Sequence, residues 1–358
     1  MPLRNSVKFL GMSTTPNYQR LRENPAFREV FEKRALILQG IRQFFIERQF
    51  LEVETPMLVK LPGMEPYLDV FKTRFQPEGG EREGHAGRDH YLITSPEYAM
   101  KKLLVGGMER IFQITRSFRN KETGGALHNP EFTMIEWYRA DADYLDIMRD
   151  TEDMMQFLCR CLYRKESFVY QGQEIDLSAG FQRMRVREAF DEYAGVSREI
   201  FEDEAALISE ARRRGYSAAS YDDAFFLLFL NEIEPKLGQG RPTILYEYPV
   251  RMAALSRVCP DDARYAERFE VYVCGMELAN AFSELTDADE QRRRLMLERA
   301  ERAKLGKDLY DVDESFIEAL RIGMPPSGGI ALGVDRLVML LLDRSSIEDV
   351  VLFPFRDL

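Results

Sequence analysis

Residues 119–138 read RNKETGGALHNPEFTMIEWY, and this stretch decides the fold because it lies between two strand-like runs. An apolar run over residues 111–118 precedes it, and an alternating run over residues 132–138 ends it. A glycine-containing connection between two such runs predicts a β-hairpin. The polar side chains gather at the loop and at the strand ends: Arg119, Glu122, His128, Glu131 and Glu136. A buried hairpin does not need such a set, whereas a site for phosphate and amine groups does; the alternative is a solvated loop with incidental charges.

The composition is that of an ordinary globular protein with an acidic balance. Of 358 residues, 49 are Lys or Arg and 60 are Asp or Glu, which gives a net charge of −11 and a pI near 5.1. This balance argues against a broad basic surface for nucleic acid and favours a small-molecule substrate or a basic protein partner. The cysteines and histidines do not form a zinc pattern, and no apolar run approaches the roughly 20 residues that span a bilayer. We therefore expect a cytoplasmic protein without a membrane contact.

The order of the expected elements indicates one large domain behind a short arm. Residues 1–25 are expected to form an N-terminal arm and residues 26–358 the catalytic domain, with a helical insertion at about 170–240. Apolar residues at three- and four-residue steps predict an amphipathic helix over residues 24–48. Strand-like runs are found at 50–56, 91–94, 243–248, 267–273, 275–282 and 327–332. Strands paired as hairpins, with helices grouped outside them, predict an α+β fold around an antiparallel sheet.

Two arginines are the candidates for binding phosphate. The sequence contains neither a Gly-x-x-x-x-Gly-Lys-Ser/Thr loop nor a Gly-x-Gly-x-x-Gly fingerprint, so a bound nucleotide would need side-chain cations. Arg119 lies at the mouth of the hairpin, and Arg336 lies in the first turn of a helix that follows Gly333. Free N–H groups and the helix dipole also favour anions at that position. The alternative for Arg336 is a surface arginine paired with Asp335 or Asp343.

Two sets of carboxylates are candidates for binding cations. Glu270 and Glu277 lie on adjacent strand-like runs, and a hairpin would bring both to one side, as magnesium prefers when it bridges phosphates. The alternative is an exposed pair on a sheet edge. Glu97, Glu136 and Glu284 lie beside aromatic residues and could hold an ammonium group by charge-assisted hydrogen bonds. Each glutamate taken alone is more often solvated.

Taken together, these residues resemble the catalytic domain of a class II aminoacyl-tRNA synthetase of the lysyl type. The resemblance covers the chain from about Ala26 to Leu358, and three separated motifs occur in order. Phe50 to Pro56 resembles the first motif, whose proline packs at a dimer interface, and Phe118-Arg119 with residues 128–132 resembles the second. Residues 329–336, GIALGVDR, resemble the third. The resemblance implies ATP and Mg²⁺ as cofactors and a homodimer as the assembly.

The resemblance also implies a role for each site residue. Arg119 would bridge the substrate carboxylate and the α-phosphate of ATP, Glu122 would assist catalysis, and Arg336 would hold the γ-phosphate. The implied ATP-binding residues further include Asn120, His128, Asn129, Phe132 and Gly333. The implied magnesium ligands are Glu270 and Glu277, and the implied substrate pocket consists of Glu97, Glu136, Tyr138, Asn280, Phe282, Glu284 and Ala331. The implied chemistry is formation of an acyl-adenylate, followed by its capture by an acceptor.

Within this superfamily the chain is most similar to the truncated lysyl-type paralogues that attach (R)-β-lysine to a lysine of translation elongation factor P. Ala331 stands where the lysyl synthetases carry glycine, and its methyl group would favour an amine displaced by one carbon. The acidic charge also argues against tRNA as the partner. Two departures from the family pattern concern the substrate. Lys121 stands where the second motif has glutamate, and we assign the role of that glutamate to Glu122. Ala281 replaces a glycine of the family pattern. The alternatives are a compact enzyme that uses α-lysine with tRNA or another acceptor, and a non-catalytic paralogue.

Overall fold

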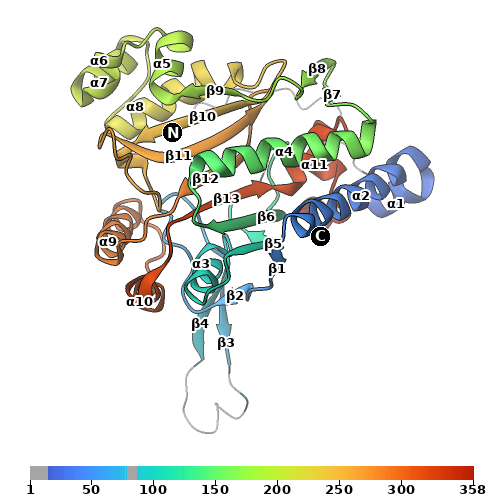
Figure 1. Ribbon diagram of the computed structural model, residues 1–358, viewed down its shortest axis with the longest axis horizontal. Helices are drawn as coiled ribbons and strands as arrows, with labels where there is room; N and C mark the ends of the chain where they lie inside the picture. The colour runs from blue at the N-terminus through green and yellow to red at the C-terminus, as the bar shows by residue number, and fades with distance from the viewer. Residues whose placement is uncertain (1–14, 77, 79–86, 124) are drawn as a thin grey trace.

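An eight-stranded sheet forms the centre of the computed structural model, which describes residues 15–76, 78, 87–123 and 125–358 (Figure 1). The strands are arranged in the order β1-β5-β6-β13-β12-β11-β10-β9. Only the outermost pairs, β1 with β5 and β10 with β9, are parallel. The strand bounds are β1 Leu51–Glu52, β5 Arg110–Phe118, β6 Glu131–Ala140, β9 Gln182–Arg185, β10 Thr243–Pro249, β11 Tyr265–Val273, β12 Met276–Ser283 and β13 Ser327–Gly333. The expected α+β fold with an antiparallel sheet is thereby confirmed.

The predicted hairpin at the second motif is the pair β5 and β6. The two strands are antiparallel over their whole length, from Arg110 opposite Arg139 to Phe118 opposite Glu131. Alternation on β6 sends Ile135 and Trp137 to one face of the sheet and Glu136 and its even-numbered neighbours to the other. The residues that the sequence analysis selected for chemistry therefore share one face.

Three helices cover the opposite face of the sheet. They are α2 (Pro25–Glu47), α4 (Tyr144–Tyr163) and α11 (Val334–Leu341), and in Figure 1 α2 and α4 lie in front of the strands. Their apolar sides form one core with the strands, which includes Phe45, Leu158 and Val338. Phe45 stacks on Phe112 of β5 at 5.0 Å between ring centroids. This closely packed helical layer covers one face of the sheet, and the face that carries Glu136 is not covered by these helices.

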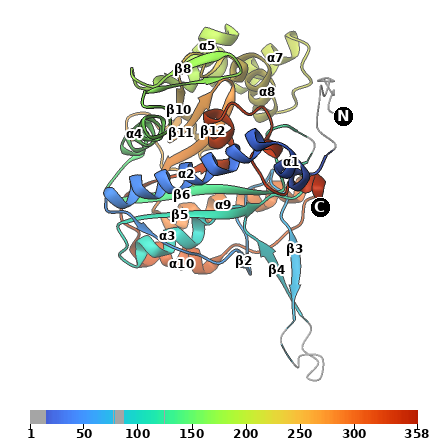
Figure 2. The same ribbon diagram turned by 90° about the vertical axis from the view of Figure 1, so that its right-hand side faces the viewer.

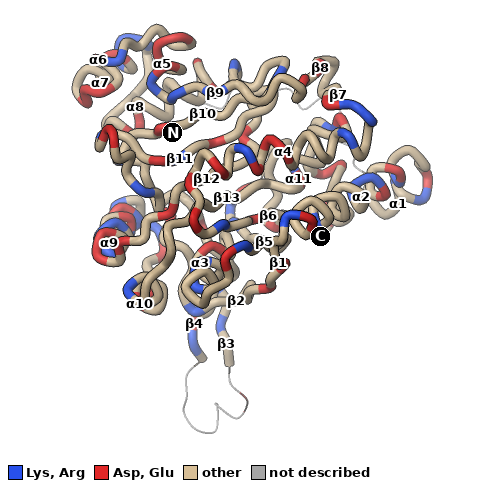
Figure 3. The backbone as a smooth tube through the Cα atoms, in the orientation of Figure 1, with Lys and Arg blue, Asp and Glu red and all other residues tan. Residues whose placement is uncertain are grey.

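Further helices border that open face. Helices α3 (Glu97–Val105), α9 (Ala288–Lys304) and α10 (Glu314–Gly323) share a second core and lie together low in Figure 1; Figure 2 shows the same arrangement from the side. A small three-stranded sheet projects beneath them, formed by β2 (Leu58–Val59), β4 (Arg88–Leu92) and β3 (Lys72–Phe75). Acidic and basic residues are interspersed along α9 (Figure 3).

The segment expected as a helical insertion at about 170–240 is only partly helical. Its first part contains β8 (Gln173–Asp176), which pairs with β7 (Ser167–Tyr170), and then β9, which joins the main sheet. The helices follow as α5 Val186–Ala194, α6 Arg198–Glu202, α7 Glu204–Arg213 and α8 Tyr221–Leu228. They pack on β10 and β11 through a third core. The expectation was wrong for β8 and β9 because short strands carry little periodic signal and acquire their pairing from distant residues.

The N-terminal arm is also more ordered than expected within its described part. Residues 1–14 lie outside the described residues, but α1 (Asn17–Glu23) is a helix. Asn17 is fully buried, and its amide donates hydrogen bonds to the carbonyl oxygens of Glu348 and Val351 at 2.7 and 2.8 Å. Contacts with the C-terminal segment therefore hold this helix. No helix among the described residues combines the length and apolar character needed to cross a membrane.

Candidate active site

Two rows of side chains lie across the open face of the sheet. The first row, set by strand register, consists of Gln113, Glu136, Ala331, Asn280 and Glu270. The second row consists of Tyr138, Gly329, Phe282 and Arg268. Each row draws its members from strands far apart in the sequence, and members of the two rows are two residues apart on their strands, so they face the same way.

A cavity of about 830 Å³ lies over these rows and contains almost all the predicted site residues. Arg119 and Arg336 both line it, as do the carboxylates of Glu97, Glu270 and Glu277. The other predicted residues in its wall are Glu122, His128, Asn129, Phe132, Glu136, Tyr138, Asn280, Phe282, Glu284, Ala331 and Gly333. Glu270 and Glu277 are not a pair on a sheet edge, because β11 and β12 lie inside the sheet, and both residues line a common cavity with two arginines.

The two asparagines predicted to bind ATP are engaged elsewhere. Asn120 does not line the cavity; it forms an isolated bridge with Asp69, and its backbone N–H donates to the Asp69 carbonyl oxygen at 2.8 Å. Asn129 lines the cavity, but its side chain donates to the Glu131 carbonyl oxygen and accepts from the Phe355 N–H. Asn120 thus contacts Asp69 through its backbone, and the Asn129 side chain connects the second motif to the C-terminal segment.

The arginine end of the cavity is a cationic corner. The Arg119 guanidinium lies over the Phe132 ring at 5.1 Å and 3.8 Å from a Glu122 oxygen. The Nε of Arg119 is buried and lacks a hydrogen-bond acceptor among the described residues. Arg336 donates to the Glu277 carbonyl oxygen at 2.7 Å, and its second terminal nitrogen lies 3.0 Å from Nε2 of His128. Burial and the nearby Arg336 lower the pKa of His128, so neutral imidazole is favoured there.

Glu270 and Glu277 lie on the predicted hairpin of β11 and β12. Its turn places Cys274 and Gly275 at positive φ (52° and 72°), a conformation that glycine adopts without strain. Glu270 accepts hydrogen bonds from the hydroxyls of Tyr248 (2.6 Å) and Tyr272 (2.5 Å) and is paired with Arg268 at 2.6 Å. Glu277 has no side-chain hydrogen bond in the described part of the chain, and burial and Glu270 raise its pKa.

The opposite end of the cavity is acidic. Glu136 is fully buried and accepts hydrogen bonds from Ser95 Oγ (2.5 Å) and from the Tyr138 hydroxyl (2.8 Å). Burial raises the pKa of Glu136 to about 8, and the Glu97 carboxylate adds to the rise, while the two hydrogen bonds oppose it. A buried carboxylate with this pKa lacks a counter-cation, so it is suited to receive an ammonium group.

Glu97 and Glu284 share one internal cation. The Lys101 ammonium lies 2.5 Å from a carboxylate oxygen of each. Burial and Glu97 nevertheless raise the pKa of Glu284 to about 7, although Lys101 lowers it. Three carboxylates and one lysine leave two negative charges at this end when all are ionised. A substrate with two ammonium groups would balance them.

Gly329 makes room for this acidic pocket. A Cβ atom on Gly329 would overlap the Glu284 carboxylate and the Tyr138 ring. A side chain at this position would therefore displace two of the groups that form the pocket. The neighbouring Gly328 faces the other side of the sheet, where a Cβ atom would lie 2.6 Å from Ile147 Cγ1. Gly329 thus leaves space on the cavity face of the sheet, and Gly328 leaves space on the helix-covered face.

Several residues that line the cavity or hold its side chains in place escaped the sequence analysis. Ser95 and Lys101 fix the acidic pocket, and Arg268 pairs with Glu270. A signal existed for Arg268, because it lies two residues before Glu270 on a strand-like run and therefore faces the same side. Glu65 lies in an irregular loop and Glu298 on a charged helix, where the sequence offers no signal of their place in the cavity wall.

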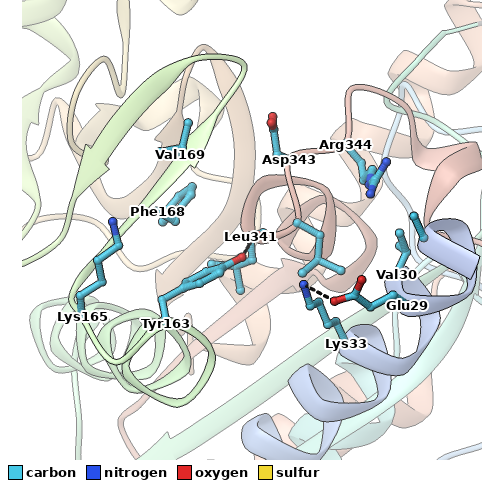
Figure 4. Close-up of a pocket in the computed structure, with 12 residues that line it drawn as sticks. Glu29, Val30, Lys33, Tyr163, Lys165, Phe168, Val169, Leu341, Asp343 and Arg344 are labelled. Atoms are coloured by element: carbon cyan, nitrogen blue, oxygen red, sulfur yellow. Dashed lines mark hydrogen bonds and ion pairs between the residues drawn. The ribbon is translucent and has the colours of Figure 1, made fainter.

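A second cavity, of about 280 Å³, lies on the helix-covered side of the molecule (Figure 4). It is lined by α2, the segment around β7 and the end of α11, with Lys33, Lys165 and Arg344 among its residues. Lys33 is paired with Glu29 at 2.9 Å. It contains none of the predicted site residues.

With this geometry established, comparison with known proteins assigns the family. The family model "tRNA synthetases class II (D, K and N)" matches residues 12–357. The chain belongs to this class II tRNA synthetase family. A protein of Haemophilus influenzae (strain KW20 / Rd) named elongation factor P–(R)-β-lysine ligase is 41% identical over 324 residues, which cover 90% of this chain and 93% of the relative. The protein of that name from Erwinia tasmaniensis is 40% identical over 326 residues, with the same coverage. The resemblance drawn from the three sequence motifs is thereby confirmed.

Proposed function

We propose that the chain is an ATP-dependent ligase that activates a lysine-type diamino acid, with (R)-β-lysine favoured, and transfers it to a lysine of elongation factor P. The observation that carries this proposal is the acidic pocket beside the two arginines. Glu97, Glu136 and Glu284 with Lys101 leave two negative charges for two substrate ammonium groups. The named relatives and the family match support the same reaction class.

The reaction consists of two group transfers. In the first, an oxygen of the substrate carboxylate attacks the α-phosphorus of ATP, the bond to the β-phosphate breaks, and pyrophosphate leaves with the electron pair. In the second, an acceptor amine attacks the acyl carbon, and AMP leaves. In this reaction Arg119 would contact both the carboxylate and the α-phosphate, and Arg336 would bind the γ-phosphate. Glu122, 3.8 Å from Arg119, would orient its guanidinium, and all three residues line the cavity. Fixed cations of this kind stabilise charge that develops during transfer.

The two cavity carboxylates fit a nucleotide-bound magnesium ion. Magnesium retains several waters and binds to one or two carboxylates together with substrate phosphates. The Glu277 carboxylate accepts no hydrogen bond among the described residues and lies 4.0 Å from the Arg336 guanidinium, while Glu270 is oriented by Tyr248, Tyr272 and Arg268. Among the described residues no group of three or more His, Cys, Asp or Glu side chains could hold a metal ion alone, which agrees with a site completed by ATP. The ion would neutralise phosphate charge during pyrophosphate release.

The experiment that tests the proposal separates the two steps. ATP–pyrophosphate exchange is measured with α-lysine and with (R)-β-lysine, and purified elongation factor P and lysine tRNA are then offered as acceptors. We expect exchange with (R)-β-lysine to exceed exchange with α-lysine, and a mass increase on elongation factor P alone. Charging of the tRNA would instead identify a compact synthetase, and absence of exchange with either amino acid would indicate a non-catalytic paralogue.

Ala331 is expected to set the choice between the two amino acids. It lies between Glu136 and Asn280 in the first row, at the floor of the pocket. Replacing it with glycine removes one methyl group, for which we expect a shift of about 10-fold towards α-lysine in the ratio of specificity constants. The measurement is exchange kinetics for both amino acids with Ala331→Gly and wild type. An unchanged ratio would show that the methyl group does not discriminate.

We also propose that the catalytic domain spans residues 26–358 and assembles as a homodimer through the region of the first motif. Exposed apolar side chains occur along α2 and the segment from β1 to β2 that follows it: Leu36, Ile46, Leu51, Met57 and Leu58. An apolar patch of this kind is typical of a protein interface.

The double variant Ile46→Asp/Leu51→Asp is expected to convert a dimer into a monomer, because charges would be buried at the contact. The mass is measured by analytical ultracentrifugation. Leu305→Asp, at an exposed leucine outside this patch, serves as the control and should stay dimeric. A monomeric wild type would refute the proposed assembly.

A further inference from the structure

Helix α9 presents two carboxylates to the cavity, Glu298 and Glu301, and the proposed adenylation step uses neither of them. Its inward side carries Gln291, Arg294, Leu295 and Arg302, which are buried, and Glu298 lies on the same side one turn from Arg294. Glu298 lines the main cavity together with Glu97 and Glu65. It is therefore in the wall of the site, on the side of the acidic pocket.

Glu298 differs from its neighbours because it has no committed partner. Within the described ranges it forms no hydrogen bond and no ion pair, and it interacts with Arg294 only at longer range. Arg294 itself is held by Glu290 at 2.8 Å and by the carbonyl oxygen of Ser256 at 2.8 Å. Glu301, the next carboxylate on α9, is paired with Lys304 at 2.6 Å.

The groups that face Glu298 favour its protonated form. Glu65 from the loop after β2 and Glu97 from α3 repel its negative charge, and the tyrosines Tyr98 and Tyr310 also face it. Burial and these carboxylates raise the pKa of Glu298 to about 8, against the effect of Arg294. A carboxylate with a pKa near the working pH is an effective proton acceptor.

The second step of the proposed reaction needs such a group. A lysine side chain has a pKa of about 10.4, so it arrives as an ammonium ion without a free electron pair. The hydroxyl acceptor of a tRNA does not have this requirement, because a neutral hydroxyl retains its electron pairs. An acidic wall attracts the ammonium group but also keeps it protonated, so a base must take the proton within the cavity.

We propose that Glu298 is the base that deprotonates the acceptor amine, an inference that rests on the proposed function. An N–H bond of the ammonium breaks, and its proton binds to a carboxylate oxygen of Glu298. The freed electron pair forms the C–N bond at the acyl carbon, the bond from that carbon to the phosphate oxygen breaks, and AMP leaves with its electrons. The second proton passes from the new amide nitrogen to the departing AMP and then to solvent.

The other carboxylates of this wall are engaged. Glu97 is paired with Lys101, and Glu136 with Ser95 and Tyr138. Glu65 accepts a long hydrogen bond from Thr94 through one oxygen, while its second oxygen is buried and has no hydrogen-bond partner among the described residues. Within the part of the chain that the structure describes, Glu298 is the carboxylate of this wall that forms neither a hydrogen bond nor an ion pair.

The test compares the two half-reactions in Glu298→Gln. We expect wild-type ATP–pyrophosphate exchange and a loss of about 100-fold or more in the rate of transfer to elongation factor P. Hydroxylamine, an acceptor that is neutral at neutral pH, should capture the adenylate at the wild-type rate. Transfer by wild type should rise with pH up to about 8 and then level off, whereas transfer by the variant should keep rising towards the lysine pKa of about 10.4, because only amine that is already deprotonated can react. Glu298→Asp should recover part of the rate.

Glu301→Gln is the matched control on the same helix and should transfer at the wild-type rate. Wild-type transfer by Glu298→Gln would overturn the inference. Equal losses in exchange, hydroxylamine capture and transfer would also overturn it, because they would indicate a structural role. The proposed function fails by a different result, namely absence of exchange in the wild type.

Discussion

Replacing Arg119 with alanine is expected to lower ATP–pyrophosphate exchange by about 10²- to 10³-fold, the loss typical of removing one fixed donor from a charge-stabilising site. Arg119 lines the cavity between the acidic pocket and Arg336, and its Nε has no acceptor among the described residues. This N–H group is therefore available to donate a hydrogen bond to a substrate oxygen. The protein should remain folded, because the side chain makes only a 3.8 Å ion pair with Glu122 and a ring contact with Phe132.

Arg116→Ala is the matched control for this variant. Arg116 lies three residues earlier, on β5, is partly exposed, and is paired with Glu131 at 3.6 Å outside the cavity. We expect its exchange rate and melting temperature to match those of wild type, since exposed ion pairs contribute at most about 1 kcal/mol. Near wild-type exchange by Arg119→Ala would refute the role assigned to Arg119. Equal losses of exchange in both variants would indicate that the substitutions disturb the structure around β5, and that the Arg119 guanidinium has no specific role.

Replacing Gly329 with alanine is expected to raise the KM for the amino acid strongly while the KM for ATP changes little. The new methyl group would overlap the Glu284 carboxylate and the Tyr138 ring, both of which form the acidic pocket. The arginine corner lies at the other end of the cavity and keeps its contacts. We expect at least about 10-fold in KM, because misplacing a charged partner costs more than 1.4 kcal/mol.

Gly328→Ala provides the contrast from the opposite face of the same strand. Its methyl group would lie 2.6 Å from Ile147 Cγ1 and 2.8 Å from the Asp143 carbonyl oxygen, inside the packed layer of α4. Overpacking of this kind lowers the free energy of unfolding by about 1–3 kcal/mol. Thermal unfolding and exchange kinetics of both variants separate the two effects. The assignment of faces fails if Gly329→Ala loses stability while its KM stays unchanged.

Strand alternation explains why so much of the site could be predicted. The sequence identifies residues 132–138 and 327–332 as strands, and the two-residue repeat alone separates Glu136 and Ala331 from Ile135 and Ile330. The predicted hairpin at 270–277 likewise follows from local alternation and a Cys-Gly turn. Such patterns are local properties of the sequence, so they can be recognised without knowing which distant segments pack nearby.

The contacts that the sequence analysis did not anticipate are non-local. Asn120 had a motif position for ATP binding but is paired with Asp69, and Asn129 holds Phe355 near the C-terminus. The strands β8 and β9 were expected to be helical, yet β9 acquires its pairing from β10, far along the chain. A side chain with several available partners takes the one that the fold brings near, which no local pattern encodes.

The amino-acid sequence by itself determined the α+β class and identified the two arginines and the carboxylates that line the cavity, because these follow from short-range periodicity and motif spacing. Only the tertiary structure decided the charge of the pocket. Lys101 is brought between Glu97 and Glu284, Ser95 reaches Glu136, and Glu298 is left without a partner. Burial and the distance between charges set the pKa of each carboxylate, and both arise when distant elements pack together.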